Sequence, residues 1–461
     1  MLEKIACAVV VVLAGASAGA QPIDTPPTWG GDLASRPRLT GSWGGLRDEM
    51  AKKGIVFDVD VMATPQGVVS GGVDRDADLW GNVDYTLNID TQKAGLWPGG
   101  FFKFWADTGF GHNIQSESGA LVPVNTQALL PFPNDQNTAL VNATFTQFLS
   151  PKFGVMMGKI GVFDLIEGEF AGDYRTQFLN TGLSFPMNML FVPLSAFGGG
   201  PIFIPSKDLI LSALVLDPNG TPLDSNIANA FDGGAMVMAT AKLGIKPFGL
   251  EGHQMVTGIW SDKERVSLQQ DPSNLFRGLA RERFPRLADP GPLLERFLTR
   301  FFPGLLQPVE PLNKKNDTWL AAYTMEQYLW QPDGDPHHGI GVFFNFAASD
   351  GNPNPIQWFF NVGIGGKGVV PGRPNDSFGI GWARSEFSND ILPIVRNRLN
   401  VGLEEENDVE LYYNAALTPW LEATLDLQII DSGLNKRIDN SGNLKDVDTA
   451  VIPGLRVRVR F

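Results

Sequence analysis

The chain has 461 residues, with 43% hydrophobic residues, 19% charged residues, 52 glycines and 33 prolines. This composition favours many short strands and turns over long helices. The net charge of -14 argues against nucleic-acid binding and against a polybasic membrane-surface role.

The N-terminus has the pattern of a secretory signal peptide. An apolar run from Ile5 to Ala14 is followed by small residues, and we predict cleavage after Ala20, so that residues 1–20 are removed. A membrane anchor is the alternative, but the run is short for a spanning helix. The only cysteine, Cys7, lies in this segment, so the mature chain would form no disulfide.

Residues 21–54 form an N-terminal segment that contains one predicted short helix. The stretch "TGSWGGLRDEMAKKG" offers Thr40 or Ser42 as N-cap and ends at Gly54. We therefore expect a short helix before the first strand.

Residues 55–461 alternate between apolar and polar residues in segments of strand length. Examples are "IVFDVDVMA", "NVDYTLNID", "VELYYNAAL", "LEATLDLQII" and the closing "GLRVRVRF". Successive side chains of a strand point to opposite faces, so one face is apolar and the other is polar, acidic or amide-rich in most segments and arginine-rich in the last one. Roughly sixteen such segments occur, each about ten residues long, which is the length of a tilted membrane strand. No stretch after residue 20 has 18 consecutive apolar residues. We predict an all-β fold, a transmembrane antiparallel β-barrel of about 16 strands.

The connections between these segments alternate between long and short. Residues 111–139, 262–316 and 431–450 are long, whereas "LSPK", "IKPFGLEG" and residues 418–420 are short. Outer-membrane barrels have this alternation, with the short turns in the periplasm, and a soluble sandwich has no reason to keep it. The exception is "SDGNPNP" at Ser349–Pro355, which is short where a long external loop is expected.

Residues 262–316 form a long loop insertion with predicted helices. In "PLLERFLTRFF" an apolar stripe comprises Leu293, Leu294, Phe297, Leu298 and Phe301. Arginines surround it at positions 277, 281, 283, 286, 296 and 300. One interpretation is a packed loop helix with a solvated face, and the other is a basic cap over or inside the pore mouth.

Four stretches resemble the carbohydrate-selective porins, the OprB family, of Gram-negative outer membranes. They are "LTGSWGGLRDEMAKKGIVFD", "GKIGVFDLIEGEFAGDYRTQFLNTGLSF", "PNDSFGIGWARSEFS" and "VELYYNAALTPWLEATLDLQII" with "GLRVRVRF". The resemblance spans nearly the whole mature chain, and the insertion is the part that matches least. It implies a sixteen-stranded sugar channel, with Phe461 as the terminal aromatic residue that the outer-membrane assembly machinery reads.

Candidate sugar contacts are polar or aromatic residues on the expected lumen face and in loops that would fold inward. A sugar channel needs hydroxyl-matching donors and acceptors and flat apolar surfaces, each binding weakly. Donors would be Arg456, Arg458 and Arg460, acceptors would be Glu410, Asp426, Asp84 and Asp107, and stacking surfaces would be Trp105 and Tyr412. By the resemblance, residues 111–139 and 164–181, including Glu169 and Arg175, would narrow the channel. For each residue the alternative is a side chain that only solvates the wall.

The predicted function is diffusion of mono- or oligosaccharides across the outer membrane, without enzymatic activity, cofactor or metal. The expected partners are carbohydrates, outer-membrane lipid and the assembly machinery, and no nucleic acid. Two alternatives stay open. A general or anion-selective porin would use the arginine faces to select anions. A secreted β-sandwich glycosidase would use a pair of carboxylates, although no pair stands out.

Overall fold

The computed structural model describes residues 25–461 except 134–135, 167, 226, 285–286, 288–289, 333–334, 391–403 and 439–443. The predicted signal peptide lies outside the described residues. No described helix is both long enough and apolar enough to cross a bilayer.

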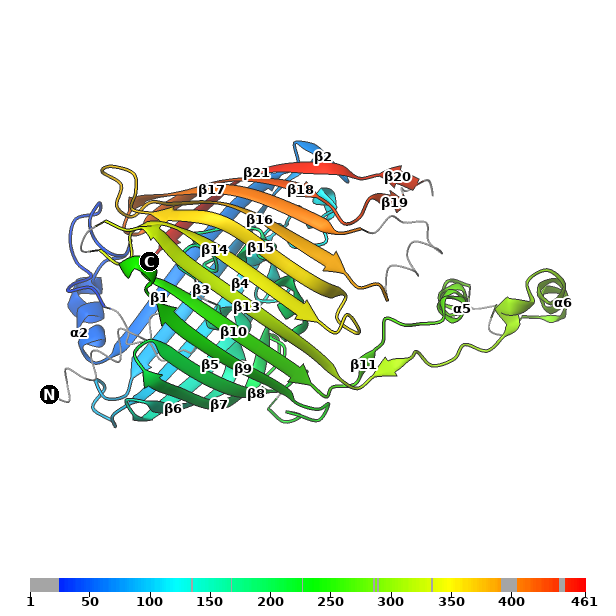
Figure 1. The fold of residues 1–461 in the computed structure, drawn as a ribbon, viewed down its shortest axis with the longest axis horizontal. Coiled ribbons are helices and arrows are strands. Elements are labelled where there is room, and N and C mark those ends of the chain that lie inside the picture. Colours follow the sequence, from blue (N-terminus) through cyan, green and yellow to red (C-terminus); the bar gives the residue numbers. More distant parts are fainter. Residues whose placement is uncertain are drawn as a thin grey trace.

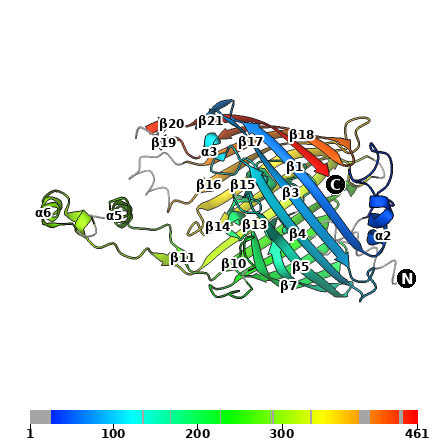
Figure 2. The same cartoon turned by 180° about the vertical axis from the view of Figure 1, so that it is seen from behind.

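Sixteen long antiparallel strands form one sheet that closes on itself (Figures 1 and 2). The wall strands are β1 (Ile55–Gly67), β3 (Ala77–Asp90), β4 (Gly100–Gly111), β5 (Thr138–Ser150), β6 (Phe153–Gly161), β7 (Ser195–Ser206), β8 (Leu209–Leu216), β9 (Met236–Ile245), β10 (Gly252–Ser261), β13 (Thr318–Trp330), β14 (Gly339–Ser349), β15 (Ile356–Lys367), β16 (Ser377–Phe387), β17 (Glu406–Thr418), β18 (Leu421–Asp431) and β21 (Asp448–Arg460). Each pairs with the next, and β21 pairs with β1, so that these sixteen described strands close into a ring without an unpaired edge strand among them. The predicted barrel is confirmed, and the sandwich required by the glycosidase alternative is excluded.

Shorter elements lie in the connections. The short strands are β2 (Ser70–Gly72), β11 (Arg265–Val266), β12 (Lys314–Lys315), β19 (Lys436–Ile438) and β20 (Leu444–Asp446). The helical elements are η2 (Trp43–Gly45), α2 (Leu46–Lys52), α3 (Gln115–Ser118), η3 (Thr126–Leu129), η4 (Val162–Leu165), α4 (Thr181–Ser184), η5 (Met187–Phe191), η6 (Pro247–Gly249), α5 (Pro272–Arg283), α6 (Pro292–Phe301) and η8 (Pro303–Leu306).

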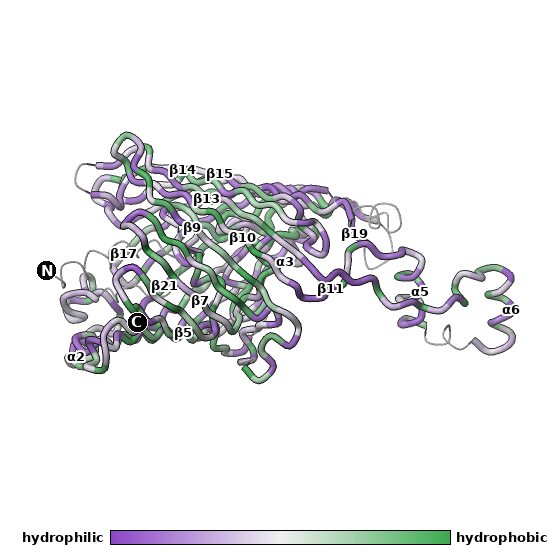
Figure 3. Tube along the Cα trace, turned by 60° about the horizontal axis from the view of Figure 1, so that its bottom comes forward, coloured by the Kyte–Doolittle hydropathy of each residue, from purple (hydrophilic) through white to green (hydrophobic). Residues whose placement is uncertain are grey.

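The wall is apolar outside and polar inside over much of its surface, as β18 illustrates. Leu425, Leu427 and Ile429 are exposed, whereas the intervening Asp426 and Gln428 are buried. Hydrophobic and hydrophilic residues alternate along the barrel strands in Figure 3. This inverted pattern suits a barrel whose outer face meets lipid.

The two ends of the barrel differ as the sequence predicts. One end, called the turn end here, carries α2, the C-terminus and the short connections, such as residues 151–152 and 419–420 (Figure 1). The opposite end, called the loop end, carries the long connections 112–137, 162–194 and 262–317. The connection 350–355 is short although it lies at the loop end, so the exception noted in the sequence is real.

Two loop-end connections fold into the barrel. We call residues 162–194 the pore loop and residues 112–137 the companion loop. Within the pore loop Phe178 and Leu183 are fully buried, and within the companion loop Leu130 is fully buried. The loops also bond to each other, since the Thr126 N–H donates to the Leu179 carbonyl over 2.8 Å.

Glycines on β15 and β16 make room for the pore loop. A Cβ at Gly365 would come within 2.8 Å of the Phe170 ring, and a Cβ at Gly379 would come within 2.8 Å of the Phe178 ring. Together with Phe343, these rings give part of the lumen an apolar core. The inner face is therefore less uniformly wet than the strand pattern predicts.

The insertion projects away from the loop end, and two opposite views show α5 and α6 beyond the barrel (Figures 1 and 2). Phe297 and Phe301 are exposed, while Leu298 is buried. In the described part of the insertion, α5 and α6 therefore do not lie inside the pore mouth. The side chains of Arg283, Arg286 and Leu293 lie outside the described residues.

The N-terminal helix is present but begins later than expected. Neither Thr40 nor Ser42 caps it, because Gly44 and Gly45 have positive φ values of 68° and 97° that interrupt the helical path before Leu46. Among the tryptophans near strand ends, Trp80 is buried inside the wall and donates to Asn82, so it belongs to the lumen and not to an outer aromatic girdle.

The segment before β1 secures the barrel seam. Arg47 of α2 is buried, donates to the Asp58 carboxylate over 2.6 Å and to the Phe461 carbonyl over 3.1 Å, and lies 4.2 Å from the Trp29 ring centroid. One side chain thereby joins the N-terminal segment, the first strand and the end of the chain.

Replacing Arg47 should destabilise the barrel. The Arg47→Ala variant leaves the Asp58 carboxylate with Arg38 alone and should lower the free energy of unfolding by about 3 kcal/mol. The measurement is the temperature at which the folded band disappears on a gel in detergent. Lys52→Ala, on the exposed side of the same helix, should leave that temperature unchanged. Equal shifts in both variants would contradict a specific role for Arg47.

Candidate functional site

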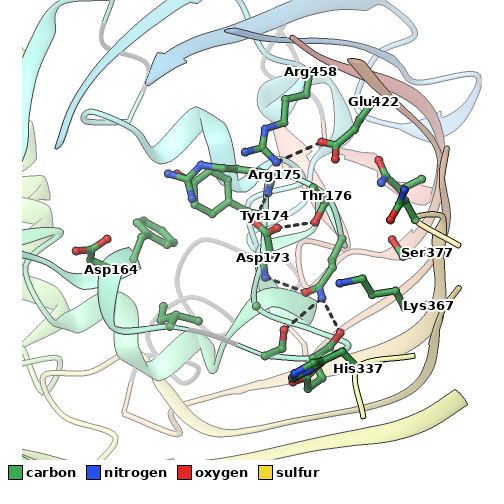
Figure 4. Close-up of a pocket in the computed structure, with 18 of the residues that line it drawn as sticks. Asp164, Asp173, Tyr174, Arg175, Thr176, His337, Lys367, Ser377, Glu422 and Arg458 are labelled. Atoms are coloured by element: carbon green, nitrogen blue, oxygen red, sulfur yellow. Dashed lines mark hydrogen bonds and ion pairs between the residues drawn. The ribbon is translucent and has the colours of Figure 1, made fainter. Parts of the chain in front are cut away.

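Cavities lined by charged residues lie inside the barrel, between the pore loop and the wall. The larger has a volume of about 710 Å³ and is lined by Lys103, Phe163, Asp164, Ile166, Gly168, Glu169, Gly172, Asp173, Tyr174, Arg175, Thr176, Gln177, Lys242, His253, His337, Lys367, Asn375, Ser377, Asn414, Glu422, Arg458 and Arg460 (Figure 4). A second cavity of about 310 Å³ adjoins it and is lined by Arg38, Asp58, Asp60, Asp84, Thr86, Lys103, Trp105, Asp164, Asp173, Arg175 and Arg458. Polar and charged groups dominate both linings.

The pore loop reaches this position because wall carboxylates bind its backbone. Glu326 on β13 accepts hydrogen bonds from the N–H groups of Glu169, Phe170 and Ala171 over 2.7–3.1 Å. It also lies 3.2 Å from the imidazole of His253. Backbone donors that converge on one carboxylate offset the cost of burying its charge. The tip of the pore loop is thereby fixed to the wall.

The other side of the pore loop is held in the same manner. Glu410 on β17 accepts from the N–H groups of Leu179 and Asn180 over 2.6 and 2.8 Å. Arg456 on β21 donates to the carbonyls of Tyr174 and Gln177, each over 2.7 Å. The wall therefore supplies both an acceptor and a donor to the buried loop backbone, in addition to the backbone hydrogen bonds within the pore loop and to the companion loop.

Ion pairs at the cavity surface join the pore loop to the wall and join wall strands to one another. Arg175 donates to Asp84 over 2.7 Å, and Arg458 lies between Asp60 and Glu422. Lys103 contacts Asp164 over 2.6 Å. These pairs keep cationic and anionic groups at fixed places along the cavity.

Asp173 in the pore loop is ionised despite its burial. Burial raises the pKa of Asp173. The Arg458 and Arg175 guanidinium groups and the Thr176 hydroxyl lower it by a larger amount, so the pKa of Asp173 lies below the ordinary value. The Thr176 hydroxyl donates to this carboxylate over 2.5 Å. Asp173 therefore carries its charge at neutral pH.

Six of the eleven sequence-predicted site residues line a cavity. Arg458, Arg460, Glu169 and Arg175 line the larger one, and Arg458, Arg175, Asp84 and Trp105 line the smaller one. Trp105 offers little flat surface, because it is 2% exposed and its indole N–H donates to Asp84.

The other five predicted residues do not line either cavity. They are buried residues of the wall, namely Arg456, Glu410, Asp426, Asp107 and Tyr412. The Tyr412 ring packs edge-on against Phe178, with centroids 4.7 Å apart, so the pore loop takes the place where a sugar was expected to stack. Arg456 and Glu410 bind the loop backbone. Their polarity serves the loop and not the open lumen.

Several cavity residues were missed by the sequence reasoning. Lys103, Lys242 and Lys367 come from wall strands, and His253 and His337 lie near Glu326 and Glu169. A usable signal was present for Lys103 and Lys242, since each stands between apolar residues in a strand segment, as in "FFKFW". For the histidines, the partners lie in other connections or strands, and sequence spacing carries no such information.

Removing the Glu326 carboxylate should loosen the pore loop. The Glu326→Ala variant loses three hydrogen bonds to the loop backbone, and we expect a loss of about 2–4 kcal/mol in local stability. Single-channel recordings should show a larger and noisier current than the unmodified protein. Glu282→Ala, an exposed site on α5, is the control and should match the unmodified protein. A quiet current of unchanged size in Glu326→Ala would refute the anchoring role.

Comparisons with known proteins agree with this architecture. Porin B of Pseudomonas aeruginosa is 27% identical over 161 residues, which cover 32% of this chain and 33% of that protein, so the match spans about one third of the relative's length. The high-pH structure of Pseudomonas putida OprB has a TM-score of 0.74 at 20% identity, covering 94% of this chain and 100% of that one. The low-pH structure of the same protein has a TM-score of 0.54 at 16% identity, with 93% and 99% coverage.

The solved structures show that the fold is shared. The family model described as "Carbohydrate-selective porin, OprB family" matches residues 74–461, which is most of the chain and includes all wall strands after β1. The chain therefore belongs to the OprB family of carbohydrate-selective porins.

Proposed function

We propose that the chain is a channel of the Gram-negative outer membrane through which carbohydrates diffuse into the periplasm. Family membership and the closed barrel support this function. The observation that carries it is the 710 Å³ cavity between the pore loop and the wall, because its lining offers many donors and acceptors to hydroxyl groups. Nothing in a channel of this type requires a reaction, a cofactor or a metal.

The geometry suits weak and reversible binding. Lys103, Arg458 and Arg175 already have carboxylate partners, so a sugar hydroxyl competes with existing ion pairs. Such a contact adds little net free energy, and a diffusing solute must leave as readily as it enters. Tyr174 and Phe163 supply the aromatic part of the lining.

Outer-membrane lipid and the assembly machinery are the further proposed partners. Exposed Trp97, Trp319, Trp330 and Trp358 lie near strand ends, as expected of an aromatic belt at the membrane interfaces. The terminal Phe461 follows β21 directly, and its N–H donates to the Val59 carbonyl over 2.8 Å. We propose that residues 1–20 act as an export signal. We also propose that the assembly machinery reads Phe461 before the seam closes.

A general or anion-selective porin is the second candidate. The observation that favours it is the set of cations on the cavity wall, among them Lys242, Lys367 and Arg460. The two candidates differ in what a neutral sugar does to the current. With the purified protein in a planar bilayer, saturable block by glucose or maltose supports the sugar channel, whereas a current that no sugar reduces supports the second candidate.

Arg458→Ala should change the selectivity of the channel without preventing its assembly. The variant removes one positive charge and leaves Asp60 and Glu422 unpaired at the cavity, so the channel should favour cations more than the unmodified protein does. The reversal potential across a potassium chloride gradient measures this shift. Arg75→Ala, at an exposed site of the connection after β1, is the charge-matched control. Unchanged selectivity and sugar block in Arg458→Ala would show that Arg458 of the terminal strand does not contribute to selectivity.

A further inference from the structure

The carboxylates that line the larger cavity already have partners within the protein. Each has a hydrogen-bond or ion-pair partner, namely Asp164 with Lys103, Glu422 with Arg458, Asp173 with Thr176, and Glu169 with Tyr328 and His337. Their negative charge is thus partly compensated by the protein itself.

Two cations on the same lining differ from these carboxylates, because they have no partner among the described residues. Lys367 is the last residue of β15 and Arg460 is the last residue of β21, so both lie at the turn end. Among the described residues, neither side chain has a hydrogen-bond or ion-pair partner, and the Nε of Arg460 is buried without an acceptor. Asp60 and Glu422 are the carboxylates that attract Arg460 electrostatically, but both form their ion pairs with Arg458. The cavity therefore presents two cationic groups that form no ion pair with a carboxylate in the described part of the chain.

Neutral polar groups stand next to one of these cations. Lys367 pairs in register with Ser377 of β16, and Ser377 pairs with Asn414 of β17. All three line the cavity, and Figure 4 shows Lys367 and Ser377 on the same side of it, opposite Asp164. A hydroxyl and an amide beside an ammonium group match a solute that carries both hydroxyls and an anionic group.

We propose that the channel prefers sugars that carry a carboxylate, such as aldonic and uronic acids, over neutral hexoses. Lys367 and Arg460 attract the carboxylate, and Ser377 and Asn414 bind hydroxyls. This inference rests on the proposed sugar channel and names its substrate class. It also requires the preference to weaken with salt, because the attraction acts through a hydrated cavity.

The test compares sodium gluconate with glucose as blockers of single-channel current. Unmodified protein should reach half block at a lower concentration of gluconate than of glucose. In Lys367→Gln/Arg460→Gln the gluconate concentration at half block should rise about 25-fold, since each partly hydrated charge pair contributes about fivefold. The glucose value should change less than about twofold, because hydroxyl contacts are retained.

The matched control is Lys52→Gln/Lys53→Gln, which removes two exposed charges at the same end of the barrel and outside the cavity. It should behave as unmodified protein. Because Arg460 is close to the seam, the single variant Lys367→Gln, with an exposed side chain, provides a second test and should raise the gluconate value about fivefold.

Each outcome separates the two proposals. Block by glucose with no advantage for gluconate would overturn the acidic-sugar preference and leave the sugar channel standing. Equal loss of both blockers in the double variant would also overturn it. A steady current that neither solute blocks would overturn the sugar channel itself.

Discussion

The interior of this barrel depends on carboxylates of the wall that bind backbone N–H groups of inward-folded loops. Glu326 and Glu410 hold the pore loop, and Glu406 holds Leu121 and Val122 of the companion loop through bonds of 2.6–3.0 Å. A loop inside a barrel has backbone groups that neither water nor a strand partner satisfies, and leaving them unpaired is costly. A glutamate pointing inward supplies two oxygens at fixed positions, so it can satisfy several donors at once.

This arrangement links the strands to the channel. The loops fill part of the lumen with an apolar core, in which Phe178 packs between Phe343 and Tyr412, and glycines of β15 and β16 leave the room that this core needs. What remains open is a smaller space lined by charged groups from both loop and wall. The charge that a solute meets is therefore set by which wall residues the loops leave uncovered.

The sequence predicted which residues point inward but could not divide them into two roles. Glu410 and Glu422 stand on neighbouring strands with the same alternation, yet Glu410 binds loop backbone and Glu422 lines the cavity. Arg456 and Arg458 differ in the same way, although only one residue separates them. The division depends on where the pore loop packs, and that packing is made by contacts between segments far apart in the chain.

The sequence by itself determined the barrel, its strand alternation, the unequal ends and the family. Period-two patterning and connection length are local properties of the chain, and a lipid-facing wall requires an apolar outer face on its strands. Only the tertiary structure decided that Trp80 faces the lumen, that α6 extends away from the pore mouth, and that Lys367 and Arg460 have no partners among the described residues. These properties depend on loops that pack by long-range contacts, whose partners follow no fixed spacing along the chain.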